Sequence, residues 1–323
     1  MAVKTLAASV TNTSGIQSIT VSDSHTAPTS TAIVVATTTS LNIGSSVTVI
    51  MGYVGDTFTA MTGYVKELEL KEPELVYTIT IANVMIRAID FFIASSSPTT
   101  PYTWQNIQAE ELIKEVLRLS GLTSFASDTS NFTFAISIPV EVNLTPAYDY
   151  ARFIGDIIAF NIYADNTGTV QIRDRRPYPV GGDSSVATIN SADGNVIEAN
   201  LDTSDRDIRN KVVVYGTGDI HAEASAVSPY LPAGYYRTVV VAAPGVIDSQ
   251  SMAQKAADYN LDLLNRLTQK LSLVIEGRTG LQARTCVTVT IPELGITAEK
   301  WYIYSVEHSL SKAGYTTTLE LHF

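Results

Sequence analysis

The chain has 323 residues, of which 45% are apolar and only 16% are charged, and its 21 basic and 32 acidic residues leave a net charge of −11. This length predicts two or three domains, and the composition argues against a disordered tail, a basic nucleic-acid arm or a coiled coil. The acidic balance argues against docking on phosphate backbones, because each phosphate contact needs a lysine or an arginine.

Two further features bear on where the chain works. Its single cysteine, Cys286, cannot form an internal disulfide or build a zinc cluster. The first residues show no charged segment followed by the apolar core of a signal peptide, and no apolar run approaches the length of about 18 residues that a membrane span needs. We therefore expect a chain that is made and used without membrane passage and that has no membrane span.

The first part of the chain, residues 1–93, has the pattern of an antiparallel β-domain. Short runs rich in Val, Ile and Thr are separated by Ser-Gly, Asp-Ser and Gly-Ser turn signals. Two later runs alternate apolar and polar residues, which is typical of half-buried strands. The turn between them contains Pro73, which has no backbone N–H to donate to a ladder. The pattern predicts a barrel or sandwich with strands at 16–21, 32–36, 46–51, 64–70 and 75–81.

The second part, residues 94–200, reads as a mixed α/β domain that begins with a Ser- and Pro-rich linker. Apolar residues at helical spacing predict a first helix, which Gly121 stops, and a second helix with Thr145 as its cap and Pro146 as its first residue. An Asn-Thr-Gly turn after the second helix predicts a hairpin. The expected elements are helices at about 106–120 and 146–160 and a hairpin at 161–174.

The third part, residues 201–323, returns to β character and contains one helix at about 251–268, opened by a capping-box pattern at Ser251. We expect the apolar face of this helix to pack on its own β-domain, while Asp262 and Arg266 lie on the opposite, polar face. The expected apolar face is Met252, Ala256, Tyr259, Leu263 and Leu267. The expected strands are 211–216, 238–242, 271–276, 286–291, 301–308 and 315–323.

The sequence carries none of the motifs that bring phosphates, dinucleotides or an acyl nucleophile to a site. Its four histidines stand singly, and His308 reads as part of a polar strand face. Cys286 fits a β alternation and is most simply a buried small residue. The acidic cluster Asp202, Asp205 and Asp207 lacks the glycine and the closing glutamate of a calcium loop. We therefore predict no catalytic, metal-binding or cofactor-binding residue.

A loop rich in Gly and Pro carries three tyrosines, Tyr230, Tyr235 and Tyr236. Exposed tyrosine offers apolar area with a hydrogen-bonding tip, which suits a contact with another protein. The same loop could instead fold back and cover its own domain, and the sequence leaves both readings open.

The order of these parts, and several short passages within them, resemble the late-control-D-like family. Its members are tail or baseplate hub proteins of contractile-tailed phages and phage-tail-like particles. One departure is that the family usually places a glycine in the turn where this chain has 282–285. The passages that carry the resemblance are 63–65, 88–90, 162–168, 208–216, 253–267, 271–277, 301–308 and 315–321.

The resemblance implies a mainly β fold in which two tail-tube-like antiparallel β-barrels flank a mixed α/β middle domain. It implies a structural homotrimer, not an enzyme, that joins the six-fold tail tube to the three-fold central spike. Its partners would be the tail tube protein, the spike protein and other baseplate (wedge) proteins. Its place would be the virion tail baseplate, after assembly in the host cytoplasm. Genomic DNA would pass through its channel without specific binding, since like charge prevents adhesion.

By the same resemblance, the helix that carries Asp262 and Arg266 should lie on the outside of the ring or between subunits. Two other classes stay open. One is a β-rich carbohydrate- or receptor-binding tail module, for which the tyrosine loop is the argument. The other is a cell-wall-degrading tail enzyme, which would need a cleft with a carboxylate of raised pKa.

Overall fold

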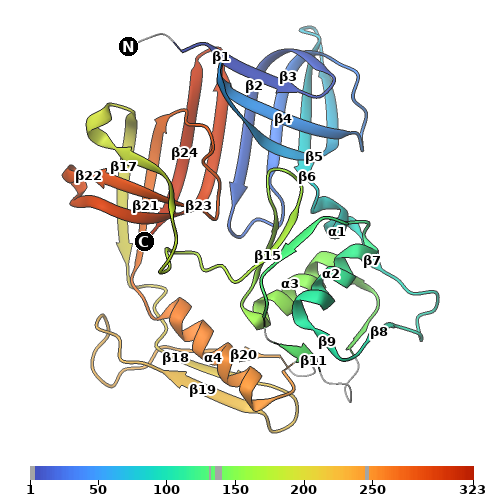
Figure 1. The fold of residues 1–323 in the computed structure, drawn as a ribbon, viewed down its shortest axis with the longest axis vertical. Coiled ribbons are helices and arrows are strands. Elements are labelled where there is room, and N and C mark those ends of the chain that lie inside the picture. The colour runs from blue at the N-terminus through green and yellow to red at the C-terminus, as the bar shows by residue number, and fades with distance from the viewer. Residues whose placement is uncertain (1–3, 131, 135–139, 244–246) are drawn as a thin grey trace.

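The computed structural model describes residues 4–130, 132–134, 140–243 and 247–323. Within these residues the chain is mainly β, with a large sheet, several small sheets and four α-helices (Figure 1). The large sheet occupies the upper half of the view. The helices lie with the small sheets in the lower half.

The strands of the first 83 residues form a group that closes on itself, here called the N-terminal β-group. Its strands run in the order β1-β4-β5-β6-β3-β2, and β1 pairs back to β2 through Val10 and Thr13, so the sheet is partly ring-like. Apolar side chains at alternate positions fill its interior. The strands are β1 (Leu6–Val10), β2 (Thr13–Ser24), β3 (Thr31–Thr39), β4 (Ser46–Tyr53), β5 (Asp56–Lys71) and β6 (Val76–Asn83).

Six later strands form the C-terminal β-group, in the order β16-β22-β23-β24-β21-β17. All neighbours are antiparallel except β16 and β22, which are parallel. Its core contains Trp301, which is 1% exposed. Short 3₁₀ turns connect β16 to β17 (η1, Ser191–Asp193) and β22 to β23 (η2, Pro292–Leu294). The strands are β16 (Ser185–Asn190), β17 (Val196–Ser204), β21 (Thr268–Glu276), β22 (Cys286–Ile291), β23 (Ile296–Ser311) and β24 (Gly314–His322).

The two β-groups share a strand order. When the strands of each group are numbered one to six along the chain, both groups run one-four-five-six-three-two. The groups are also joined directly, because Ser18–Ser24 of β2 pairs antiparallel with Ser305–Ser311 of β23. This β2–β23 joint makes one twelve-stranded sheet out of both groups, which the sequence did not predict.

Along the chain, a small α/β part lies between the two groups, and in it α2 packs on α3. Gly121, with φ of +83°, follows α2 as predicted. The start of α3 differs from the prediction, since Thr145 lies in a short strand and Pro146 is the N-cap residue. Ala159, in the left-handed region, ends α3. The helices are α1 (Ile86–Asp90), α2 (Ala109–Leu119) and α3 (Ala147–Ile158).

The strands of this part are short. A three-stranded sheet, β10-β15-β14, contains the predicted hairpin, and three two-stranded pairs surround the helices. The strands are β7 (Phe92–Ile93), β8 (Tyr102–Trp104), β9 (Ile107–Gln108), β10 (Phe125–Ser127), β11 (Thr133–Phe134), β12 (Val140–Val142), β13 (Thr145–Pro146), β14 (Asn161–Ala164) and β15 (Val170–Arg173).

The remaining helix, α4 (Gln250–Leu264), packs on a separate sheet and not on the large one. That sheet has the order β19-β18-β20, and α4 contacts β18 and β19. The cap is Ser249, whose Oγ accepts a hydrogen bond from the backbone N–H of Met252, so the predicted start at Ser251 was wrong. The strands are β18 (Lys211–Tyr215), β19 (His221–Ser225) and β20 (Thr238–Ala242).

The buried residues of α4, which are Met252, Ala253, Ala256 and Ala257, share one core with α2 and α3. Tyr259 and Leu263 of the expected apolar face are not part of this core, and Leu267 lies beyond the end of the helix. Two other findings concern the whole chain. The boundary drawn between residues 200 and 201 cuts through β17, so the strands of the C-terminal β-group begin at Ser185. Among the described residues, no helix is long and apolar enough to cross a membrane.

Candidate functional site

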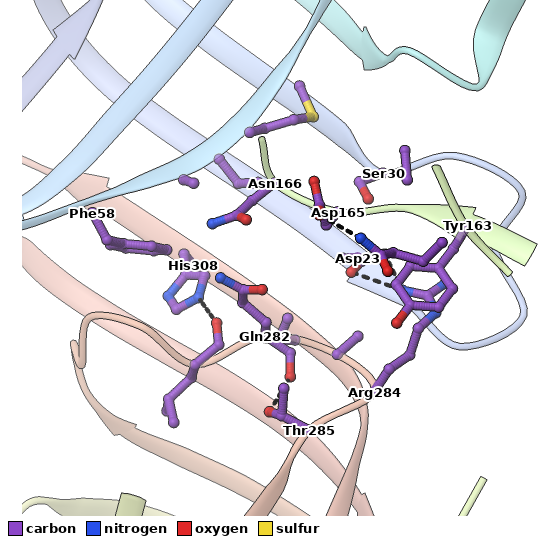
Figure 2. Close-up of a pocket in the computed structure, with 18 residues that line it drawn as sticks. Asp23, Ser30, Phe58, Tyr163, Asp165, Asn166, Gln282, Arg284, Thr285 and His308 are labelled. Carbon is purple, nitrogen blue, oxygen red and sulfur yellow. Dashed lines mark hydrogen bonds and ion pairs between the residues drawn. The ribbon is translucent and has the colours of Figure 1, made fainter. Parts of the chain in front are cut away.

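The N-terminal β-group, the hairpin β14–β15 and the loop before β22 meet around a cavity of about 120 Å³. Figure 2 shows that its labelled side chains come from these three parts and, in the case of His308, from β23. The cavity is smaller than the roughly 300–1,000 Å³ typical of small-molecule sites, and its mixed polar and apolar walls suit water molecules. Polar groups in the wall include Asp23, Asp165, Asn166, Gln282, Arg284 and His308.

Arg284 ties the three parts together from one side of this cavity. Its Nη1 donates to both carboxylate oxygens of Asp23 on β2, at 3.0 and 2.9 Å, and its Nε donates to Asn161 Oδ1 on β14 at 3.1 Å. Its guanidinium lies 4.2 Å from the ring centroid of Tyr163. Arg284 is only 6% exposed, so this ion pair is screened far less than a surface pair.

Arg175 forms a second set of hydrogen bonds beside those of Arg284. Its Nη1 donates to the two carboxylate oxygens of Asp183, at 3.0 and 2.8 Å, and its Nε donates to the backbone oxygen of Arg284 at 3.2 Å. Burial would raise the pKa of Asp183, but hydrogen bonds from Val180 N–H and Arg175 outweigh it and lower that pKa below its usual value. The two arginines therefore form a continuous polar link between the β-groups.

Cys286 lies against this link. Burial raises the pKa of its thiol to about 11, although the hydrogen bond from Arg175 opposes that rise. The thiol is therefore neutral near pH 7 and is not an activated nucleophile. The predicted buried position of Cys286 is confirmed, since it is 2% exposed.

His25, which follows β2, contacts β23 beside these two arginines; Arg284, Arg175, their partners and His25 are here called the junction. Its Nδ1 lies 2.6 Å from Tyr302 Oη on β23, and its ring stacks on Tyr304. Burial, followed by the positive charges of Arg284 and Arg175, lowers the pKa of His25 to about 3. The imidazole is neutral at physiological pH and does not add a third cation to the junction.

His308 is buried, contrary to the predicted polar face. It is 2% exposed, and its Nε2 lies 2.9 Å from the backbone oxygen of Leu281. Because a carbonyl only accepts, Nε2 carries the proton and Nδ1 accepts, 2.8 Å from Tyr315 Oη. Burial lowers the pKa of His308 to about 4. Both ring nitrogens are occupied, so His308 has no free position for a metal or a substrate.

These contacts join the N-terminal β-group, β14 and the loop before β22. In the part of the chain that the structure describes, no cluster of three or more His, Cys, Asp or Glu side chains could hold a metal ion. This junction was not identified from the sequence. The available signal was the rarity of cations, since two adjacent arginines stand out in an acidic chain with 21 basic residues.

A larger groove of about 530 Å³ lies between α3, β20 and α4. Asp156 lines it with a side chain that is 70% exposed, and partial desolvation raises the pKa of that carboxyl while Arg152 opposes the rise. It is the only carboxylate among the described residues of the wall. Glycoside hydrolysis in its common form needs a pair of carboxylates, and this wall presents one.

The three tyrosines of the predicted contact loop are exposed. Tyr230, Tyr235 and Tyr236 are 49%, 54% and 53% exposed. The buried Asn210 holds the base of the loop, because its Nδ2 donates to Tyr235 O and its Oδ1 accepts from Arg237 N–H. The tyrosine rings therefore remain available to another molecule.

Asp262 and Arg266 make contacts within their own chain. Asp262 Oδ2 accepts from Arg176 Nε at 3.0 Å and from Tyr178 Oη at 2.6 Å. The guanidinium of Arg266 lies 3.4 Å from the ring centroid of Tyr178, and its Nη2 donates to the backbone oxygen of Phe323. These residues link α4 to the loop after β15.

Comparison with known proteins gives a match in structure. No protein-family model matches the chain, and no curated protein matches it in sequence. The crystal structure of a tail protein from Neisseria meningitidis MC58 matches with a TM-score of 0.71 and 13% identity, over 99% of this chain and 97% of that one.

Two further solved structures agree with this match. The 43 kDa tail protein of prophage MuSo2 from Shewanella oneidensis has a TM-score of 0.71 and 16% identity, covering 99% of this chain and 98% of its own. The E. coli c3393 protein, a component of the type VI secretion system, has a TM-score of 0.59 and 9% identity, over 98% of this chain and 76% of that one. The predicted resemblance to phage tail proteins is thus confirmed in structure, and this chain has their fold over its whole length.

Proposed function

We propose that this chain is a structural protein of a phage tail or phage-tail-like particle, and that it acts as the baseplate hub. In this role it joins the six-fold tail tube to the three-fold central spike and forms part of the DNA channel. The observation that supports this proposal most directly is the structural match, over 99% of this chain, to two tail proteins. The solved E. coli c3393 protein is described as similar to the T4 bacteriophage tail proteins gp27 and gp5, which agrees with this proposal.

The repeated strand order supports the mechanical part of the proposal. Each β-group would be one tube-like barrel, so three copies of the chain would present six barrels to the tube and remain three-fold toward the spike. The proposed domains are a first barrel at 1–93, a middle α/β domain from 94, and a second barrel that starts at β16 instead of at residue 201. The ion pair between Arg284 and Asp23 would hold the two barrels in a fixed orientation relative to each other.

The other proposed features follow from charge and exposure. A net charge of −11 would let DNA pass without adhesion. The exposed tyrosine loop would contact a spike, tube or wedge protein, in a baseplate assembled in the host cytoplasm. The role is non-enzymatic, and it needs no cofactor.

The test is a mass measurement of the purified protein, alone and mixed with its tube and spike neighbours. We expect a trimer and a complex that contains both neighbours. A monomer that binds neither would overturn the hub.

The exposed tyrosine loop also favours a second candidate, a carbohydrate- or receptor-binding tail module. Binding of the isolated protein on a glycan array, lost in a Tyr235→Ser/Tyr236→Ser variant, would favour that module. Zymography of the wild type and an Asp156→Asn variant would expose a cell-wall-degrading enzyme.

A further inference from the structure

The two β-groups share two irregularities as well as a strand order, although β1 is antiparallel to β4 whereas β16 is parallel to β22. In each group the second strand carries a β-bulge in its ladder with the third strand, and the fifth strand carries one in its ladder with the sixth. Following the ladders from these bulges equates β17 with β2 and β5 with β23, so that Leu201 corresponds to Val21 and Leu70 to His308. The bulges lie between Ile16 and Ser18, Val196 and Glu198, Val65 and Glu67, and Ile303 and Ser305.

The β2–β23 joint uses the second strand of one group and the fifth strand of the other. The counterpart strands, β17 and β5, remain open. β17 is the last strand of the large sheet, and β4 accompanies β5 only as far as Tyr64. Among the described residues, no strand pairs with the outer edge of β5 from Lys66 to Lys71. Figure 1 shows β17 and β5 on opposite sides of the sheet.

An unpaired strand edge is a template for a further strand, and each copy of the chain carries both edges that the same joint needs. We propose that β17 of one copy pairs with β5 of a second copy, antiparallel and in the register of the β2–β23 joint. This inference rests on the proposed hub function for its partner, a second copy of the chain, and it adds the strands and the register.

Apolar side chains support this register. At the β2–β23 joint Val21 lies opposite His308, and the two are 3% and 2% exposed. The equivalent residues are Leu201 and Leu70, and Leu70 is now 46% exposed. Pairing β17 with β5 would place these two leucines opposite each other and cover them, as the internal joint covers its own pair.

One pair of polar side chains in this register carries like charge. Asp202 would lie opposite Glu69, where the internal joint has Ser22 opposite Glu307. Lys71 Nζ lies 4.0 Å from Glu69, and Lys270 is the register neighbour of Asp202 across the β17–β21 ladder, although its Nζ lies 3.7 Å from Glu320. This pair of like charges opposes the joint, and its effect can be measured by reversing either charge.

The joint is heterologous, since it uses a different edge on each side. Heterologous joints produce closed rings when the rotation closes and open filaments when it does not. Each added copy brings two β-groups, so a closed ring contains an even number of groups. This geometry agrees with a ring of proposed tube-like barrels.

Cysteine cross-linking tests the register. Glu69→Cys and Asp202→Cys place exposed thiols directly opposite each other in the proposed joint. We expect the two single variants to form disulfide-linked dimers only when they are mixed, and the double variant to form larger covalent species. The pair Glu69→Cys and Glu198→Cys is the matched control, because Glu198 is exposed on the same strand but lies four residues from Asp202.

The experiment is done on purified protein and on assembled tails. Dimers from one single variant alone would indicate a symmetric pairing and overturn the proposal, as would equal cross-linking by the control. Absence of cross-links in tails that still contain the protein would overturn the joint and leave the hub function standing. Cross-linked rings that bind neither tube nor spike would support the joint and overturn the hub.

Discussion

Arg284 and Asp23 are 261 positions apart in the chain, yet they share two hydrogen bonds of 3.0 and 2.9 Å. The side chain of Arg284 is 2% exposed and that of Asp23 is 21% exposed. A buried ion pair of this kind is costly to break, because the remaining partner keeps its charge away from water. The contact therefore couples the stability of the N-terminal β-group to that of the C-terminal one.

Asp23→Ala should lower the free energy of unfolding by about 3–5 kcal/mol, since it leaves the Arg284 guanidinium with its charge uncompensated. Urea unfolding followed by circular dichroism measures this loss. Arg152→Ala is the control, because the Arg152–Asp156 pair lies on the surface and should cost no more than about 1 kcal/mol. Equal losses for both variants would contradict the coupling.

The backbone of Arg284 gives a second prediction. Its φ is +70°, a region that glycine adopts freely and that other residues adopt at a cost of about 1–2 kcal/mol. Arg284→Ala loses the ion pair and keeps this cost, whereas Arg284→Gly loses the ion pair and removes it. The Gly variant should therefore be more stable than the Ala variant by about 1 kcal/mol in urea unfolding. An Ala variant as stable as the Gly variant would show that the turn is not strained.

Arg284 also illustrates which features of the structure could be predicted from the sequence and which could not. The resemblance identified the turn at 282–285 as unusual for lacking glycine, and the positive φ of Arg284 gives the reason: arginine takes a glycine-like conformation in order to reach Asp23. Alternation and helical spacing located most strands and all three long helices. They did not reveal β17, because its mixture of Glu, Asn, Asp and Thr with few apolar residues reads as a polar approach to a strand. The pairing of β2 with β23 depends on long-range geometry, which local patterns do not contain.

Stability should fall as the pH falls below neutrality, because His25 and His308 are buried as neutral groups. Burial lowers their pKa values to about 3 and about 4, whereas both would take up a proton near pH 6.5 in the unfolded chain. Above pH 6.5 both histidines are neutral in the folded and the unfolded chain, and the free energy of unfolding is unaffected. Below pH 6.5 that free energy falls by about 1.4 kcal/mol per pH unit for each histidine, until the pH reaches the pKa of the folded state.

Urea unfolding between pH 7 and pH 5 measures this slope. His308→Gln should flatten it by about half, although it also lowers the stability at pH 7. His221, which is exposed, provides the control, and His221→Gln should leave the slope unchanged. A slope that His308→Gln does not alter would show that the titrating groups lie elsewhere.

Reversing the charge of Asp262 should destabilise the fold, in contrast to the expectation from the sequence that this position lies on a polar face toward water or a neighbour. Asp262 accepts hydrogen bonds from Arg176 and from the buried Tyr178, whose pKa is raised to about 12 by burial and by Asp262. Asp262→Lys should cost about 1–3 kcal/mol, because it removes the acceptor of Tyr178 and faces Arg176 with a like charge. Asp258→Lys on the same helix is the control, and thermal unfolding compares the two. A harmless Asp262→Lys that weakens assembly would restore the original expectation.

Charge reversal at the proposed β5–β17 joint gives the last prediction. Glu69 and Asp202 would lie directly opposite each other, and like charges in that position are destabilising by a few tenths of a kcal/mol up to about 1 kcal/mol. Glu69→Lys alone, or Asp202→Lys alone, should therefore strengthen self-association, by up to about fivefold in the dissociation constant. The double variant places two lysines opposite each other and should return association to near its original strength. Light scattering over a range of concentrations measures all four proteins, and high salt should reduce the differences because it screens exposed charges. Additive effects in the double variant would mean that the two side chains do not meet, and would overturn this register.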